Sequence, residues 1–395
     1  MNDVGNFNKK KFMTISRLNV IFFCLIFLSN CAQENGSNSP KTNNIEIIVD
    51  AEHSFSLSDY LTDNGLLDSY VDSIYASLDE TDLIAQLIMP AVGKYGQSKE
   101  TINGLINDHL IGGVLMLNGT KEEFSKWIKE FNQSNIKHGN LPFLYSADAE
   151  PSLVNRKIIG SKMVKKANEI DSISEVISVA STISKDLNDI GINYNFSPVI
   201  DMSKNSTVGY RGFGKIPANI IPWSDAFIQT TQENNIIATA KHFPGHGLVS
   251  GDTHKSLQVI KGELKEISNY PPLISNGVLS VMVAHIAIEG NKEYNTNGLP
   301  STCSKKVVTE LLRDQMQFNG IIVTDAMNMG GVRNVPNNSV KAIAAGCDIL
   351  LMPADARKAH KEILEEYKKG NEEFRNTVTE SAKRIIRMKI CLGLI

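Results

Sequence analysis

The sequence predicts an α/β fold, a single (β/α)8 barrel of the TIM type formed by residues 51–395. Three observations support this prediction. Short apolar runs alternate with longer amphipathic or polar segments, no linker rich in Pro, Gly and Ser divides the chain, and ionisable residues follow the ends of several apolar runs. A length of about 350 residues exceeds one average domain but is ordinary for one barrel of this kind.

The short apolar runs are the candidate strands. Eight occur, at residues 87–92, 113–117, 143–146, 192–200, 236–241, 279–288, 321–324 and 348–352. Helix-like stretches lie among them at 121–136, 172–190, 223–234 and 304–317, and a last one covers 372–388. Alternation of this kind is typical of repeated βα units, so the strands are predicted to run parallel and to close into a barrel.

Residues 1–31 are predicted to be a lipoprotein signal peptide. Basic residues precede the apolar run 20–28, which ends just before Cys31. Nine apolar residues cannot cross a bilayer as a helix, which takes about 20. The thiol that follows the run resembles a bacterial lipobox, with Asn30 in place of the usual Gly, Ala or Ser. We therefore expect Cys31 to be acylated and to become the mature N-terminus.

Residues 32–50 are predicted to be a polar tether between this lipid and the folded domain. Gln33, and not Asp, stands two positions after Cys31. By similarity to Gram-negative lipoproteins, this favours an anchor in the outer membrane, on its periplasmic or cell-surface side. The alternative is an unmodified Cys31 in a soluble secreted protein.

Composition narrows the possible partners. The net charge is −3 and no long basic run follows residue 17, so nucleic acid is not an expected partner. Cys303, Cys347 and Cys391 are too widely spaced to form a disulfide framework, and Cys347 lies in an apolar stretch typical of a core. We expect a monomer that is attached to the membrane only by its lipid and that needs no cofactor.

The loop at residues 241–247, followed by 252–254, is the most informative stretch of the chain. It directly follows the apolar run 236–240 and combines imidazoles and a carboxylate with Pro244 and Gly245. One interpretation is a metal site, with ligands drawn from His242, His246, Asp252 and His254. Pro244 and Gly245 oppose the helix that a His-x-x-x-His zinc pair requires. The other interpretations are a rigid hydrogen-bonded turn and a catalytic loop.

Ionisable residues follow or occupy five consecutive candidate strands. They are Asp148 and Glu150 after the third, Asp201 and Arg211 after the fourth, Lys241 and His242 at the fifth, His285 in the sixth, and Asp325 after the seventh. A barrel brings the carboxyl ends of its parallel strands to one mouth. The sequence therefore predicts a catalytic or binding site there.

These residues resemble the N-terminal catalytic barrel of glycoside hydrolase family 3, in its β-N-acetylglucosaminidase (β-N-acetylhexosaminidase) branch, along residues 80–390. The motifs that carry the resemblance are Lys241-His-Phe-Pro-Gly-His-Gly247 with Asp252-Thr-His254, Asn195-Phe-Ser-Pro-Val-Ile-Asp201, the pair Arg211 and Phe213, and Val323-Thr-Asp-Ala-Met-Asn-Met329.

The resemblance implies a retaining mechanism in which Asp325 attacks the anomeric carbon to form a glycosyl-enzyme. An N-cap role for Asp325 is the structural alternative. The implied acid/base is His254, with Asp252 as the carboxylate that orients its ring. An imidazole, with an ordinary pKa near 6.5, can donate a proton to the leaving oxygen and later accept one from water.

The resemblance also implies which residues hold the sugar hydroxyls in this branch, namely Asp148, Arg211, Lys241 and His242. The stretch from Asp148 to Val154 departs from the usual Asp-Gln-Glu-Gly-Gly-Arg-Val, because Pro151 and Ser152 replace the glycines and Leu153 replaces a sugar-contacting arginine. Arg156 is close enough in sequence to compensate.

The leading hypothesis is a retaining exo-β-N-acetylhexosaminidase that removes terminal N-acetylglucosamine from peptidoglycan fragments or other glycans outside the cytoplasm. Two-domain β-glucosidases of the wider family place their acid/base on a second domain, whereas this chain carries His254. Two alternatives remain. One is a lipid-anchored glycan-binding protein with a decayed site. The other is a β-N-acetylglucosaminide phosphorylase, since a neutral imidazole repels phosphate less than a carboxylate does.

Overall fold

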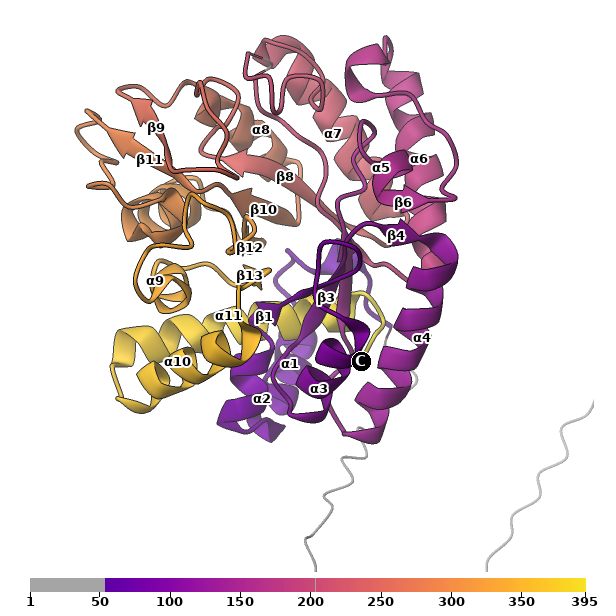
Figure 1. Ribbon diagram of the computed structural model, residues 1–395, viewed down its shortest axis with the longest axis vertical. Helices are drawn as coiled ribbons and strands as arrows, with labels where there is room; N and C mark the ends of the chain where they lie inside the picture. The colour runs from indigo at the N-terminus through magenta and orange to yellow at the C-terminus, as the bar shows by residue number, and fades with distance from the viewer. Residues whose placement is uncertain (1–53, 203) are drawn as a thin grey trace, which may run out of the picture. The chain divides into compact units, whose positions relative to one another are not determined.

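The computed structural model describes residues 54–202 and 204–395, which form an α/β fold around a curled parallel sheet (Figure 1). The predicted signal peptide (1–31), the polar tether (32–50) and the lipidation site Cys31 lie outside the described residues. None of the helices in the described part is long and apolar enough to cross a membrane.

The main sheet has seven strands in the order β12-β10-β8-β7-β5-β3-β2, all paired in parallel. In chain order they are β2 (Ala91–Val92), β3 (Gly113–Met116), β5 (Leu144–Ala147), β7 (Tyr194–Asn195), β8 (Ile237–Phe243), β10 (Ser280–Val283) and β12 (Ile321–Thr324). Sequence order follows spatial order with crossovers between neighbours, as successive βα units require.

Two further strands, β1 (Ile88–Met89) and β13 (Leu350–Leu351), pair in parallel with each other. Hydrogen bonds connect this pair to both edges of the main sheet. The Thr324 N–H of β12 donates to the Ile349 carbonyl at 3.0 Å, and the Leu115 N–H of β3 donates to the Pro90 carbonyl at 2.8 Å. Each of the eight predicted apolar runs therefore contains a strand.

Two of the predicted strands were too long. The run 279–288 divides into β10 and β11 (Ile286–Glu289), and β11 pairs instead with β9 (Gln258–Lys261) in a small separate sheet. In the run 192–200 only β7 is regular, because Pro198 has no N–H to donate to the ladder. Continuous hydrophobicity did not reveal these breaks, since the residues beyond them are buried as well.

Eleven α-helices lie within the described residues: α1 (Gly65–Ser77), α2 (Glu80–Ala85), α3 (Lys99–Asn107), α4 (Lys121–Lys137), α5 (Val154–Lys157), α6 (Ile173–Ile190), α7 (Pro217–Glu233), α8 (Tyr270–Ser275), α9 (Asn338–Ala344), α10 (Ala356–Lys368) and α11 (Glu372–Cys391). Short 3-10 helices cover Leu57–Asp59, Ala167–Glu169, Lys265–Asn269 and Ser301–Cys303, and a π-helix, η5, covers Lys306–Gln315.

The predicted helices 121–136, 172–190 and 372–388 correspond to α4, α6 and α11. Local capping explains the first two. Thr120 and Glu123 form a capping box at α4, and α6 has Ser172 as its N-cap and Gly191, whose φ is +95°, as its C-cap. The helix predicted at 223–234 begins earlier, at Pro217, because proline suits the first turn of a helix. The one predicted at 304–317 is the π-helix η5.

The core lies inside the sheet and between the sheet and its helices. Strand residues are buried throughout β3, β5, β8, β10 and β12, as is usual for parallel strands covered on both faces. Cys303, Cys347 and Cys391 are buried and make no disulfide. The chief polar exceptions among the buried strand residues, Lys241 and His242, lie near the carboxyl end of β8.

Candidate active site

A cavity of about 420 Å³ lies at the carboxyl ends of the strands. It gathers residues from loops that are far apart in the sequence. Six of the residues predicted for the site line it: Asp148, Arg211, Lys241, His242, His254 and Asp325. The seventh, Asp252, is hydrogen-bonded to His254. The structure thus brings these seven residues together at one end of the sheet.

Asp325 immediately follows β12, and its N–H donates to the Val283 carbonyl of β10 at 2.9 Å. Its side chain accepts a hydrogen bond of 2.8 Å from the N–H of Ala326. Burial raises the pKa of this carboxyl, but His242 and His285 outweigh burial and hold it below its ordinary value. Asp325 is not the N-cap of a helix, since the next helix, α9, begins only at Asn338. Asp325 is an ionised carboxylate at the cavity wall.

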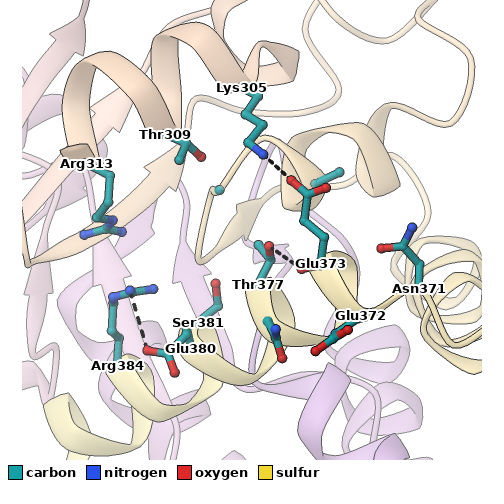
Figure 2. Close-up of a pocket in the computed structure, with 13 residues that line it drawn as sticks. Lys305, Thr309, Arg313, Asn371, Glu372, Glu373, Thr377, Glu380, Ser381 and Arg384 are labelled. Atoms are coloured by element: carbon teal, nitrogen blue, oxygen red, sulfur yellow. Dashed lines mark hydrogen bonds and ion pairs between the residues drawn. The ribbon is translucent and has the colours of Figure 1, made fainter. Parts of the chain in front are cut away.

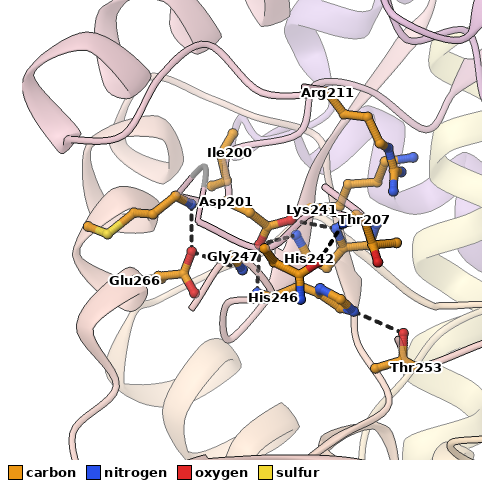
Figure 3. Close-up of polar contacts among 12 residues, drawn as sticks. Ile200, Asp201, Thr207, Arg211, Lys241, His242, His246, Gly247, Thr253 and Glu266 are labelled. Carbon is orange, nitrogen blue, oxygen red and sulfur yellow. Dashed lines mark hydrogen bonds and ion pairs between the residues drawn. The ribbon is translucent and has the colours of Figure 1, made fainter. Parts of the chain in front are cut away.

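Asp201 ties the end of β8 to the bent loop that follows it (Figure 3). Its Oδ2 accepts from His242 Nδ1 at 2.7 Å, and its Oδ1 accepts from the backbone N–H groups of His242 and His246 at 3.2 and 2.8 Å. Burial raises the pKa of Asp201, but the two histidines bring it below the ordinary value. Because Nδ1 of His242 is engaged, Nε2 is the ring nitrogen left for a ligand in the cavity.

Lys241 is buried at the centre of an ionic network. Its Nζ lies 2.9 Å from Asp148 Oδ1 and 2.6 Å from Glu150 Oε1. Arg211 donates two parallel hydrogen bonds to Glu150, from Nε to Oε2 at 2.8 Å and from Nη2 to Oε1 at 2.6 Å. Burial opposes the charged form of Glu150, yet Arg211 and Lys241 lower its pKa to about 2. The network fixes ionised donors and acceptors in the cavity without leaving a buried charge unpaired.

His254 and Asp252 form a pair on the outer side of the cavity. His254 Nδ1 lies 2.7 Å from Asp252 Oδ1, which also accepts the backbone N–H of His254 at 3.0 Å. The His254 side chain is 62% exposed. Burial raises the pKa of Asp252, but the two hydrogen bonds from His254 bring it below its ordinary value. The carboxylate therefore fixes one ring nitrogen and leaves the other accessible from solvent.

Two glycines hold the loop that carries Asp252 and His254, here called the histidine loop, against the turn after β12. The Gly330 N–H donates to the His254 carbonyl and the Gly331 N–H donates to the Thr253 carbonyl, both at 3.0 Å. A Cβ at Gly330 would lie only 2.1 Å from the carbonyl oxygen of Lys255. The close approach requires glycine, and it brings the loop of His254 against the turn that begins at Asp325.

Two further histidines, His246 and His285, make structural contacts and do not line the cavity. The ring of His246 is buried, with Nε2 3.0 Å from Thr253 Oγ1, so it braces the loop internally. His285 is buried between Thr302 Oγ1 and the Ala326 carbonyl, at 2.9 and 3.0 Å, and does not line the cavity. We expected His285 at the mouth, but the break between β10 and β11 turns it into the core.

Sequence reasoning missed Glu266, which connects two loops (Figure 3). Its carboxyl accepts backbone N–H bonds from Met202 at 2.6 Å, Gly247 at 3.2 Å and Leu248 at 3.1 Å. Burial and the nearby Asp201 raise the pKa of Glu266 to about 8. A side chain whose partners are all backbone groups leaves no motif in the sequence, so no local signal could have revealed this role.

Lys157 was missed as well. It lines the cavity and lies 2.5 Å from Asp148 Oδ2. Arg156, which the sequence left undecided, lines the same cavity. The departure at Pro151 and Ser152 is accommodated because Ser152 Oγ donates to the Tyr210 carbonyl at 2.7 Å and accepts the Ala167 N–H at 2.9 Å.

A larger cavity of about 720 Å³ lies elsewhere, between η5 and α11 (Figure 2). Its cations are already paired: Lys305 with Glu373, Arg313 with Asp348, and Arg384 with Asp348. Arg313 also donates to carbonyls just before β12, so this cavity lies toward the opposite end of the strands. Across residues 54–202 and 204–395, no cluster of His, Cys, Asp or Glu is arranged to hold a metal ion.

A family model described as "Glycosyl hydrolase family 3 N terminal domain" matches residues 78–388 of the chain. A "Beta-N-acetylglucosaminidase/beta-glucosidase" of Cellulomonas fimi is 27% identical over 361 residues, which cover 85% of this chain and 61% of that protein. A "Beta-hexosaminidase" of Hydrogenovibrio crunogenus is 28% identical over 270 residues, 63% of this chain and 73% of that protein.

Among solved structures, a glycoside hydrolase family 3 β-N-acetylglucosaminidase from Paenibacillus sp. str. FPU-7 superposes with a TM-score of 0.73 at 25% identity. The match covers 80% of this chain and 63% of that one. The chain thus spans less than two thirds of the length of this protein and of the Cellulomonas relative.

Proposed function

Because the chain belongs to glycosyl hydrolase family 3, we propose that it is a retaining exo-β-N-acetylhexosaminidase that hydrolyses terminal N-acetylglucosamine from peptidoglycan fragments or other glycans. The observation that carries the proposal is that Asp325 and His254, two groups suited to different tasks, line one cavity. The names of the Cellulomonas and Hydrogenovibrio relatives support the same class of substrate.

In the first step Asp325 attacks the anomeric carbon. The C–O bond to the leaving group breaks while the bond from the carboxylate oxygen to the sugar forms, and His254 transfers a proton to the departing oxygen. The lowered pKa of Asp325 keeps it ionised at neutral pH, as a nucleophile requires. Its hydrogen bond from Ala326 engages Oδ1 and leaves Oδ2 without a partner among the described residues.

In the second step water displaces Asp325 from the sugar, and His254 accepts the proton from that water. Asp252 fixes Nδ1 of His254 and stabilises the protonated ring that exists between proton transfers. The exposure of His254 supports this assignment, because its free nitrogen must reach first the leaving oxygen and then incoming water.

The residues proposed to hold the sugar ring are Lys241, His242, Asp148 and Arg211. Lys and Arg supply N–H donors and the carboxylates accept from hydroxyls, a combination suited to a polyhydroxylated ring. The ionic network that joins these groups lets the cavity present charged side chains in fixed positions before substrate arrives.

The direct test is hydrolysis of a chromogenic N-acetylglucosaminide, with the anomer of the first product followed by NMR. The β-anomer is expected to appear first, since two displacements retain configuration. An inverted product would overturn the mechanism, and binding of the sugar without turnover would favour the glycan-binding alternative. A parallel reaction in inorganic phosphate distinguishes phosphorolysis, which would yield the sugar 1-phosphate.

We also infer that the sheet closes on itself as a single (β/α)8 barrel. Support comes from the hydrogen bonds between the two edges of the main sheet and the pair β1 and β13. Strand β1 pairs with β13, the Ile349 carbonyl accepts an N–H bond from β12, and the Pro90 carbonyl, between β1 and β2, accepts one from β3. Closure would explain why residues after β5, β8 and β12 converge on one cavity.

Finally, we propose that Cys31 carries lipid that tethers the enzyme to the outer membrane. The support is the basic segment and apolar run that end at this thiol. Metabolic labelling with a palmitate analogue should mark the wild-type protein and not the Cys31→Ser variant. Label that persists in the variant would contradict acylation at this position.

A further inference from the structure

Lys157 adds a cation to the cavity on the helical face that also carries Leu153. Leu153 precedes the short helix α5 and Lys157 ends it, and the Lys157 N–H donates to the Leu153 carbonyl at 3.0 Å. Residues four apart lie on the same face of a helix. Both side chains line the cavity, so Lys157 places its charge on the face where Leu153 supplies only apolar surface.

The contacts of Lys157 direct its ammonium group toward the sugar-binding residues. Nζ lies 2.5 Å from Asp148 Oδ2, while Lys241 lies 2.9 Å from the other oxygen, Oδ1. The Lys157 side chain is 17% exposed. Burial raises the pKa of Asp148, but Lys157 and Lys241 hold it well below its ordinary value. Asp148 is therefore an ionised carboxylate clamped between two ammonium groups.

Lys157 has unused hydrogen-bonding capacity. An ammonium group carries three donors, and the single bond to Asp148 is the one side-chain interaction of Lys157 with the described residues. Asp148 in turn keeps lone pairs beyond the two that accept from lysines. A hydroxyl group both donates and accepts, so a sugar hydroxyl placed here can donate to Asp148 and accept from Lys157.

We propose that Lys157 is a substrate-binding residue that donates a hydrogen bond to one hydroxyl of the terminal N-acetylhexosamine and so determines specificity at that hydroxyl. This inference rests on the proposed function. Lys157 makes this contact together with Asp148, to which its Nζ is bonded. The substrate class selected by the pair is a sugar with a free hydroxyl at that carbon.

The first experiment compares variants on a chromogenic N-acetylglucosaminide. Lys157→Met removes the charge while keeping most of the side-chain length, and it should raise KM by roughly tenfold or more, with kcat changed much less. Lys157→Arg should retain most of the affinity. The matched control is Lys162→Met, because Lys162 is an exposed lysine on the following segment that does not line the cavity.

The second experiment tests whether Lys157 acts on one particular hydroxyl of the sugar. The 3-deoxy, 4-deoxy and 6-deoxy analogues of the substrate are assayed with wild type and Lys157→Met. If Lys157 contacts one hydroxyl, removing that hydroxyl should cost little further affinity in Lys157→Met. For the other two analogues, the loss caused by the missing hydroxyl should add to the loss caused by Lys157→Met.

Three outcomes would overturn the inference: an unchanged KM in Lys157→Met, the same loss in Lys162→Met, or additive losses for all three analogues. Each of these leaves the proposed function standing, because the wild-type enzyme still hydrolyses the parent substrate. Failure of the wild type to hydrolyse any N-acetylhexosaminide would instead contradict the proposed function.

Discussion

Asp325 and His254 line the same cavity but differ in environment. The carboxylate of Asp325 is partly buried and receives a backbone hydrogen bond, whereas the imidazole of His254 is mostly exposed and paired with Asp252. A fixed, partly desolvated carboxylate suits a nucleophile, and an accessible imidazole suits repeated proton transfer. The two assignments therefore predict different defects.

Asp325→Asn should abolish turnover for every leaving group, because the glycosyl-enzyme cannot form. His254→Ala should still form the intermediate from dinitrophenyl N-acetylglucosaminide, whose leaving group needs little protonation, but should lose about 10²- to 10⁴-fold on natural glycans. Rapid-quench or stopped-flow release of dinitrophenol should show a burst for His254→Ala and none for Asp325→Asn. Equal losses on good and poor leaving groups in His254→Ala would remove its acid/base role.

At the scale of elements, the site depends on how loops from different strands are fastened together. Glu266 joins the loop after β7 to the loop after β8, and Gly330 and Gly331 join the histidine loop to the turn after β12. These contacts set the relative positions of Asp201, His254 and Asp325, although neither Glu266 nor Gly330 is expected to touch the reacting atoms.

Glu266→Gln should lower both stability and kcat. The amide replaces one acceptor oxygen with an NH2 group that faces backbone N–H donors, and a buried unsatisfied donor costs about 1–3 kcal/mol. The free energy of unfolding in urea and the kinetics on a chromogenic substrate measure the two effects. The matched control is Glu263→Gln, an exposed residue three positions earlier. Wild-type stability and kcat in Glu266→Gln would show that the three backbone bonds do not hold the loops.

Gly330→Ala should displace the histidine loop, because the added Cβ would lie 2.1 Å from the Lys255 carbonyl oxygen. Overpacking of this kind typically costs about 1–3 kcal/mol. We expect a fall in kcat for substrates that need acid assistance and a smaller effect on dinitrophenyl glycosides, as in a partial His254 defect. Gly65→Ala is the control, since a Cβ there meets no atom within 4 Å. An equal loss on both kinds of substrate would show that the substitution acts beyond the loop.

At the scale of the whole molecule, Lys389 is a buried charge far from the active site. It lies on α11, where Nζ donates to Gln86 Oε1 at 2.6 Å and to the Gly112 carbonyl at 3.1 Å, and neither acceptor is an acid. Burial lowers the pKa of Lys389 from 10.5 to about 7. The contacts join the last helix to Gln86, at the end of α2, and to Gly112, just before β3.

The pKa shift of Lys389 predicts a stability that depends on pH. Between pH 7 and 10.5 the unfolded chain keeps this proton while the folded protein releases it, so the free energy of unfolding should rise with pH in that window, by up to about 1.4 kcal/mol per unit. Lys389→Met should remove this rise and be more stable than wild type near pH 6. Urea unfolding at several pH values measures both the slope and the stability near pH 6. The control is Lys361→Met, because Lys361 is exposed. An unchanged slope in Lys389→Met would contradict the prediction.

The sequence by itself determined the positions of the strands, of the helices α4, α6, α7, η5 and α11, and of the main residues of the candidate site. Apolar runs mark parallel strands because both faces are buried, and polar residues at their carboxyl ends stand out against that background. Asp325, His254, Asp252 and Lys241 were found in this way, since each belongs to a motif of neighbouring residues.

Only the tertiary structure decided the rest. The end of β10 before His285 depends on which strand is available to pair, and the roles of Glu266 and Lys389 depend on backbone groups that come from distant segments. Lys157 became part of the site because one turn of α5 places it beside Asp148. Such contacts join residues through space, so the pattern along the chain carries no sign of them until the fold brings the partners together.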